Sequence, residues 1–214
     1  MASIYDLKPR FQALLRPATC WLADRGVTAN QVTLAAVALS LVTGALVAAD
    51  PASWAVLLSV PVVLFLRMAL NAVDGMLARE HGMKTPLGAV LNELGDVVSD
   101  AGLYLPLALV PGVSALGVTL IVVLGIVSEM AGVVAVQIGV DRRYDGPFGK
   151  SDRAFVFGCI FFLLGYGVEP GTWLNVVWWI TGALATATVI NRSRRALEIA
   201  GRPLSGDTDG QRAP

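Results

Sequence analysis

Residues 54–79 read WAVLLSVPVVLFLRMALNAVDGMLAR. The first part of this run is apolar, and the whole run exceeds the roughly 20 residues that a helix needs to cross a bilayer. Arg67, Asn71 and Asp74 break the apolar pattern toward its end. Polar and ionisable groups are costly inside lipid, so this stretch indicates a membrane protein with a functional site in one of its spanning helices.

Five more apolar runs accompany this one along the 214-residue chain. We expect spanning helices at residues 31–49, 54–79, 86–110, 113–138, 153–168 and 172–191. Asn30 is the expected N-cap of the first helix, and Pro61 and Pro106 can kink the second and third.

The composition points the same way. Only 15% of the residues are charged, against roughly 25% in a soluble domain. Sixteen basic and sixteen acidic residues cancel, which leaves no net positive charge to attract a nucleic acid. A soluble enzyme and a DNA-binding protein are therefore excluded.

The predicted fold is all-α, an integral membrane bundle of six transmembrane helices preceded by an N-terminal interfacial amphipathic helix. Residues 2–24 mix apolar side chains at three- and four-residue steps with basic ones, a pattern typical of a helix lying on a membrane surface. A plain juxtamembrane linker is the alternative, because Pro9 and Pro17 interrupt the pattern. We expect residues 1–202 to form one domain and residues 203–214 a disordered cytoplasmic tail.

The basic residues predict the orientation. They lie at the two ends of the chain and in the connections after the second and fourth helices, whereas the other three connections hold no Lys or Arg. Arg67, inside the second helix, is the exception. Since cytoplasmic loops carry the excess of Lys and Arg, both termini are expected in the cytoplasm.

Two polar stripes follow from the helical period. The first, within roughly 60° on the second helix, is Arg67, Asn71, Asp74 and Ala78. The second climbs the third helix in steps of four residues: Gly88, Asn92, Asp96 and Asp100.

The short connection 80–85 makes these two helices antiparallel, and we expect them to be direct neighbours with facing stripes just below the cytoplasmic surface. Gly75, Ala78, Gly88 and Gly95 would let the two backbones, or a bulky ligand, come close. Oxygen ligands without His or Cys suit a hard cation such as Mg²⁺, Mn²⁺ or Ca²⁺. The alternative is a set of interhelical hydrogen bonds with an Arg67–Asp74 ion pair that only holds the bundle together.

The same residues resemble the signature of the CDP-alcohol phosphotransferase (phosphatidyltransferase) family. That signature is Asp-x₂-Asp-Gly-x₂-Ala-Arg, about eight residues, then Gly-x₃-Asp-x₃-Asp. The chain reads Asn71-x₂-Asp74-Gly75-x₂-Ala78-Arg79, eight residues, Gly88-x₃-Asn92-x₃-Asp96. Residues 27–33 (VTANQVT) also look like the family, and its bacterial members are phosphatidyltransferases of the inner membrane.

The resemblance implies transfer of a phosphatidyl group from CDP-diacylglycerol to the hydroxyl of a small polar alcohol, phosphorylated or free, with release of CMP. It implies one or two divalent cations, Mg²⁺ or Mn²⁺, a cytoplasmic active site and, as is common in the family, a homodimer. Carried over position by position, Asn71, Asp74, Asn92 and Asp96 would hold the metal, and Asp96 would also be the general base. Asp74, Gly75, Ala78, Arg79 and Gly88 would contact the nucleotide diphosphate.

Two signature positions differ, because Asn71 and Asn92 stand where the family has Asp. Asparagine still offers a carbonyl oxygen to a hard cation, but the site loses two negative charges. We therefore expect weaker or substrate-assisted metal binding. Glu93 and Asp100 could compensate, although Glu93 points about 100° away from Asn92 on the helix.

Several charged residues lie outside the signature. Lys150 and Arg153 follow a glycine-rich turn and could bind an anionic acceptor or, alternatively, lipid headgroups. Glu129 is expected to pair with Arg67 or to line the acceptor pocket. Arg192, Arg194 and Arg195 are expected to anchor the last helix at the headgroups.

Two other functions remain open. One is a small transporter that moves a cation or proton past the intramembrane acids, although such sites lie near the bilayer midplane. The other is a lipid- or nucleotide-binding homologue without turnover, suggested by Asn71 and Asn92.

Overall fold

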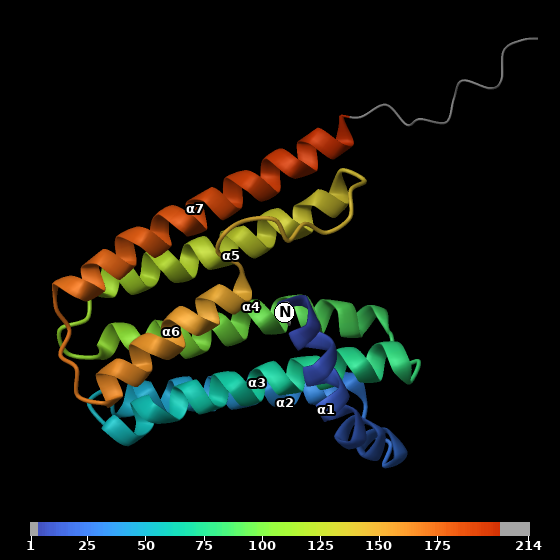
Figure 1. The fold of residues 1–214 in the computed structure, drawn as a ribbon, viewed down its shortest axis with the longest axis horizontal. Coiled ribbons are helices and arrows are strands. Elements are labelled where there is room, and N and C mark those ends of the chain that lie inside the picture. The colour runs from blue at the N-terminus through green and yellow to red at the C-terminus, as the bar shows by residue number, and fades with distance from the viewer. Residues whose placement is uncertain (1–3, 202–214) are drawn as a thin grey trace, which may run out of the picture.

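The computed structural model describes residues 4–201, and all regular structure in that range is helical. The helices are α1 (Ile4–Asp24), α2 (Ala29–Ala49), α3 (Trp54–Glu80), α4 (Pro86–Tyr104), α5 (Ala115–Gln137), α6 (Lys150–Gly165) and α7 (Thr172–Ala200), with a 3₁₀ helix, η1 (Leu105–Leu109), after α4 (Figure 1). The all-α prediction is confirmed for these residues. The expected tail at 203–214 and residues 2–3 lie outside them.

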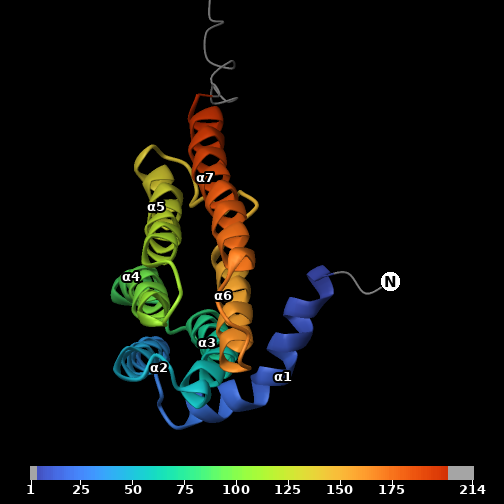
Figure 2. The same cartoon turned by 90° about the vertical axis from the view of Figure 1, so that its left-hand side faces the viewer.

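The helices α2 to α7 run between two ends of an elongated bundle, and α1 lies at an angle to them (Figures 1 and 2). Connections 50–53, 110–114 and 166–171 gather at one end, and connection 81–85 lies at the other. Helix α6 is short and accompanies the bundle over part of its length. By length and apolar composition, α2, α3, α5 and α7 can each cross a membrane.

Two helix boundaries differ from the prediction for identifiable reasons. Thr28, rather than Asn30, caps α2, because the Thr28 side chain accepts from the Gln31 N–H while the Gln31 side chain accepts from the Thr28 N–H. The predicted helix 86–110 ends as an α-helix at Tyr104 and continues as η1. Pro106 lacks the N–H that the next α-helical turn would need.

Helix α2 packs closely against both α3 and α4, which corrects the expected direct packing of α3 on α4. Gly44 of α2 meets Gly102 of α4, where a Cβ on Gly44 would overlap the Gly102 carbonyl. Gly95, expected to face α3, points instead toward Val37 of α2, 3.0 Å from where its Cβ would stand. The contacts between α3 and α4 are therefore made mainly by polar side chains.

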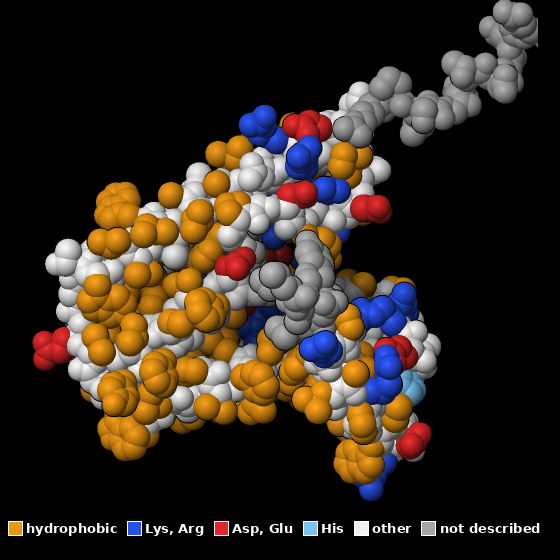
Figure 3. Space-filling model, viewed as in Figure 1, with side chains coloured by type: hydrophobic (Ala, Val, Ile, Leu, Met, Phe, Trp, Pro, Cys, Tyr) orange, Lys and Arg blue, Asp and Glu red, His pale blue; other side chains and the backbone are white. Residues whose placement is uncertain are grey.

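Helix α1 is held against α3 near the end that carries connection 81–85. Arg16 and Glu80 form an ion pair of 3.0 Å, and Phe11 packs edge-on against Phe65. Hydrophobic side chains cover most of the face drawn in Figure 3, whereas Lys, Arg, Asp and Glu gather toward its right-hand end. The molecule is thus apolar along its length and charged at one end.

Candidate active site

A cavity of about 590 Å³ opens between α2, α3, α4 and the 81–85 connection. Six of the predicted site residues line it: Asp74, Gly75, Ala78, Arg79, Gly88 and Asn92. Gly75 leaves room for the Arg79 side chain, because a Cβ on Gly75 would stand 3.1 Å from the Arg79 guanidinium. Of the two stripes predicted from the helical period, Asp74, Ala78, Gly88 and Asn92 line this cavity, and Arg67, Asn71, Asp96 and Asp100 do not. Gly75 and Arg79 were expected here from the family resemblance, and α2 completes the cavity between α3 and α4.

Asp74 is buried in this wall and is fixed by α2. The Thr33 hydroxyl lies 2.8 Å from Asp74 Oδ2 and donates to it, so one carboxylate oxygen is already satisfied. Asn30 also lines the cavity, with its Oδ1 2.7 Å from where a Cβ on Gly88 would stand. Sequence reasoning missed Asn30 and Thr33 as site residues. Their i, i+3 spacing on one face of α2 was the available signal.

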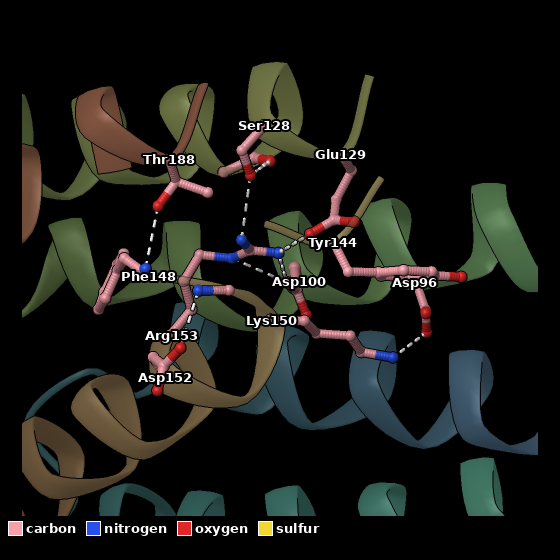
Figure 4. Close-up of polar contacts among 12 residues, drawn as sticks. Asp96, Asp100, Ser128, Glu129, Tyr144, Phe148, Lys150, Asp152, Arg153 and Thr188 are labelled. Carbon is pink, nitrogen blue, oxygen red and sulfur yellow. Dashed lines mark hydrogen bonds and ion pairs between the residues drawn. The ribbon is translucent and has the colours of Figure 1, made fainter. Parts of the chain in front are cut away.

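Asn71 and Asp96 meet outside the lining of this cavity. The Asn71 amide nitrogen donates to Asp96 Oδ1 at 3.4 Å, which joins α3 to α4. The Lys150 ammonium, from the start of α6, also pairs with Asp96 Oδ1 (Figure 4). The Arg67 guanidinium lies 3.7 Å from the same oxygen. Asp96 is therefore surrounded by hydrogen-bond donors from two helices other than its own.

A second cavity, of about 450 Å³, lies between α3 and α6. Its polar lining consists of Arg67, Asn71, Lys150 and Ser151, and the rest is apolar, including Phe65, Met68 and Phe155. The polar side chains of the lining can therefore meet an anionic group, while the apolar ones accept hydrocarbon. The Lys150–Asp96–Asn71 contact borders this second cavity.

A buried ion network lies deeper between α3, α4, α5 and α6. Arg67 pairs with Asp100 at 2.6 Å. Arg153 pairs with Asp100 and Glu129 at 3.1 and 3.0 Å (Figure 4). The proposed Arg67–Asp74 and Arg67–Glu129 pairs are therefore wrong, because Arg67 reaches across to α4 instead. Arg153 is only 3% exposed, and its side chain is engaged in these ion pairs. That Arg153 binds an acceptor stays a prediction.

Connection 138–149 is tied to this network. Arg142 pairs with Glu93 at 2.5 Å and with Glu129 at 3.1 Å. Arg143 bonds to Asp145 at 2.8 Å and holds the pKa of that carboxyl below its usual value. Glu93 thus faces the connection rather than Asn92. If Glu93 compensates for the negative charges that Asn71 and Asn92 lack, it does so from this position beside connection 138–149.

Arg192 is not a headgroup anchor. Its side chain is 2% exposed, where it donates to the backbone carbonyls of Ser128 and Asp145 and pairs with Glu129 at 3.4 Å. The expectation of a surface role failed because Thr188, four residues earlier, is also buried and sets the same face of α7 against the bundle. Arg195, by contrast, is exposed and pairs with Glu198.

The donor set limits what metal the site can hold. No group of three or more His, Cys, Asp or Glu side chains in residues 4–201 is arranged to bind an ion. Asp74 and Asn92 offer a carboxylate and an amide oxygen to the first cavity, which suits one hard divalent cation. Asn71 turns its amide nitrogen toward Asp96, and Lys150 already neutralises Asp96. The residues that line the first cavity therefore fit a divalent ion.

Comparison with known proteins identifies relatives of this chain. The chain is 49% identical over 197 residues to Inner membrane protein YnbA of Escherichia coli strain K12, which covers 91% of this chain and 96% of that protein. Its fold is similar to that of Mycobacterium tuberculosis phosphatidylinositol phosphate synthase (PgsA1) with CDP-DAG bound, with a TM-score of 0.73 at 19% identity over 88% of this chain and 97% of the other.

A second structure of PgsA1, in complex with manganese and citrate, matches with the same TM-score of 0.73 over 92% of its chain. The sequence profile of CDP-alcohol phosphatidyltransferases matches residues 26–190, a range that holds both polar stripes and every helix from α2 to most of α7. The chain belongs to the CDP-alcohol phosphatidyltransferase family.

Proposed function

We propose that this protein transfers a phosphatidyl group from CDP-diacylglycerol to the hydroxyl of a small polar alcohol and releases CMP. The observation that carries the proposal is the first cavity, where acidic, amide and cationic groups surround an open space at the charged end of an apolar bundle. Family membership supports the reaction class, and PgsA1, a protein of the same fold, binds CDP-DAG.

In this proposal the cytidine diphosphate enters the first cavity. Arg79 and Lys84 supply positive charge to the diphosphate from one wall, and the absence of a side chain at Gly75 and Gly88 leaves space for it. The second cavity, to which both α3 and α6 contribute apolar side chains, accommodates the glycerol and the first carbons of the acyl chains. The reacting phosphorus then lies between the two cavities, close to Asp96.

The transfer forms one bond and breaks another at the lipid-side phosphorus. The acceptor oxygen forms a bond to phosphorus, the bond from phosphorus to the bridging oxygen breaks, and CMP leaves with that oxygen. Asp96 is the proposed general base that takes the proton of the acceptor hydroxyl. Lys150, paired with Asp96, supplies positive charge to an anionic acceptor or to the phosphate that accumulates charge.

Asp74 and Asn92 are the proposed holders of a divalent cation, Mg²⁺ or Mn²⁺, with Asn71 and Asp96 at the margin of that site. When bound, such a cation neutralises charge on the diphosphate and stabilises the leaving CMP. Thr33 orients Asp74 by donating to one of its oxygens and leaves the other free to bind. The manganese found with PgsA1 supports a divalent ion in this fold.

We further propose that all six helices α2 to α7 cross the inner membrane of a bacterium, with both termini and the active site on the cytoplasmic side. Helix α4 with η1 connects the two ends of the bundle, as a spanning segment would. Helix α1 lies at the interface, residues 1–202 act as one domain, and the protein forms a homodimer.

Release of CMP tests the activity directly. Purified protein in lipid micelles with CDP-diacylglycerol, Mg²⁺ or Mn²⁺ and a panel of polyols and polyol phosphates is expected to release CMP with at least one acceptor. Asp96→Asn should lose turnover by at least a hundredfold, the lower range for a positioned general base. Glu198→Gln, on the exposed end of α7, is the matched control and should retain activity.

A homologue that binds the donor without turnover is the second candidate. Asn71 and Asn92 remove two negative charges from the signature, and the Lys150 ammonium occupies Asp96. Binding of CDP-diacylglycerol without CMP release for any acceptor would favour this candidate and would overturn the proposed transfer. Asp96→Asn with full turnover would overturn the general-base assignment alone.

A further inference from the structure

The backbone just before Lys150 is fixed by hydrogen bonds to side chains of α6 and α7. It is the first residue of α6, directly after Gly149, whose N–H donates to the Asp152 side chain at 2.8 Å. Just before it, the Phe148 N–H donates to the Thr188 hydroxyl of α7 at 2.9 Å. Two separate contacts thus fix the backbone from which Lys150 reaches Asp96 (Figure 4).

The ammonium meets an oxygen that other donors also approach. Asp96 Oδ1 pairs with the Lys150 ammonium, accepts from the Asn71 amide at 3.4 Å and lies 3.7 Å from the Arg67 guanidinium. A metal cation beside this oxygen would have to displace the ammonium. It would also meet the amide nitrogen of Asn71 in place of an oxygen ligand.

The charges lead to the same conclusion. The four signature positions Asn71, Asp74, Asn92 and Asp96 carry two negative charges in this chain, because two of them are amides. Two divalent cations would bring four positive charges to two negative ones before substrate arrives, and Lys150 would add a fifth. One divalent cation near Asp74, with the ammonium at Asp96, leaves a single positive charge for the diphosphate to neutralise.

We propose that the Lys150 ammonium takes the place of one divalent cation beside Asp96. With Lys150 present, this site binds one metal ion fewer than it would bind with a neutral residue at position 150. The inference rests on the proposed function, because it assumes that the signature residues bind divalent cations at all. Asn71, which donates to the same oxygen, belongs to the arrangement that excludes the second ion.

The number of Mn²⁺ ions bound per chain tests this without turnover. Equilibrium Mn²⁺ binding to the purified full chain in lipid micelles, read from the electron paramagnetic resonance of free Mn²⁺, is compared for the wild type, Lys150→Met and Lys150→Gln. Each neutral variant is expected to bind one ion more per chain than the wild type. Lys150→Arg retains the charge at this position and should bind the same number as the wild type.

Lys84→Met is the matched control, because it removes the same charge from a lysine that lines the first cavity and does not pair with Asp96. It should leave the number of bound ions unchanged. The proposal is overturned if neither neutral variant gains an ion, or if Lys84→Met gains one as well. A gained ion in a protein that never releases CMP would support this inference while the proposed transfer fails, so the two failures are distinguishable.

Discussion

Gly88 lines the first cavity at a point where a side chain has little room. Its N–H donates to the hydroxyl of Thr85, the N-cap of α4, at 2.9 Å. A Cβ there would stand 2.7 Å from Asn30 Oδ1 and 3.1 Å from Thr85 Oγ1. Gly88→Ala should therefore narrow the cavity and raise the KM for CDP-diacylglycerol by about tenfold, equal to about 1.4 kcal/mol.

Initial-rate kinetics with varied donor would measure that change. Gly158→Ala is the control, because a Cβ at Gly158 on α6 makes an ordinary contact of 3.4 Å with Leu64. The KM of the control should stay at the wild-type value. An unchanged KM for Gly88→Ala would mean that the donor does not use this wall.

Arg192 and Arg195 make a second matched pair at the residue scale. Arg192 is buried against two backbone carbonyls and Glu129, whereas Arg195 is exposed with Glu198. Removing one member of a buried ion pair costs about 3 to 5 kcal/mol, while an exposed pair contributes about 1 kcal/mol or less. Arg192→Met should lower the thermal unfolding midpoint in micelles by several degrees, and Arg195→Met should barely change it.

Equal midpoints for these two variants would contradict the structural role given to Arg192. The sequence showed both as basic residues near the end of an apolar run and could not separate them. The position of the 138–149 connection separates them. Arg192 donates to the carbonyl of Asp145 in that connection, 47 residues earlier in the sequence.

The difference between local helical pattern and tertiary packing also explains how much of the candidate site the sequence could predict. The helical period is a local property, and it placed Asp74 and Ala78 of one helix and Gly88 and Asn92 of the next on faces that line one cavity. It also predicted Asn71 and Asp96 there, but they meet outside that cavity. The partners of these residues depend on tertiary packing, as in the contacts of Thr33 with Asp74 and Lys150 with Asp96. That these groups bind donor and metal stays a prediction.

At the scale of elements, α2 determines how α3 and α4 are arranged. A short connection makes two helices antiparallel, but it does not require that α3 packs directly on α4. Helices can approach closely where small residues meet, as Gly44 of α2 meets Gly102 of α4. Neither residue belongs to the polar stripes, so the stripes held no information about this contact.

Gly44→Ala tests the α2–α4 contact. The added methyl would overlap the Gly102 carbonyl, so the helices must separate, and overpacking of this kind costs about 1 to 3 kcal/mol. We expect a lower unfolding midpoint and weaker donor binding, since Thr33 and Asn30 on α2 move relative to α4. Gly182→Ala, whose Cβ would stand 3.6 Å from Ile121, is the control for an alanine in a spanning helix.

A stable Gly44→Ala variant with wild-type donor affinity would show that α2 does not set the cavity. Loss of stability in both variants would instead reflect a general intolerance of the bundle to added methyl groups. The midpoints, read in the same micelles, separate these outcomes.

For the whole molecule, two membrane topologies fit the helices but differ in the loops. Among the helices of residues 4–201, only α2, α3, α5 and α7 are long and apolar enough to be recognised as spans. Helix α6, with 16 residues, is about 24 Å long against about 30 Å of hydrocarbon. If α4 and α6 did not cross, connection 138–149 would face the periplasm. That would move Arg142 and Arg143 outside, against the usual distribution of basic residues.

Cysteine labelling distinguishes the two topologies, because both leave the C-terminus in the cytoplasm and differ at two connections. In a background with Cys20→Ser and Cys159→Ser, single cysteines are introduced at Pro111 and Asp141, which are both exposed. Six spans predict that a membrane-impermeant maleimide added to intact spheroplasts labels Pro111→Cys and leaves Asp141→Cys unlabelled until lysis. Four spans predict the reverse, because both connections then change sides. Labelling of Asp141→Cys in intact spheroplasts would therefore place Lys150, nine residues later, on the wrong side of the membrane for a cytoplasmic donor, and the proposed site would fail together with the six-helix topology.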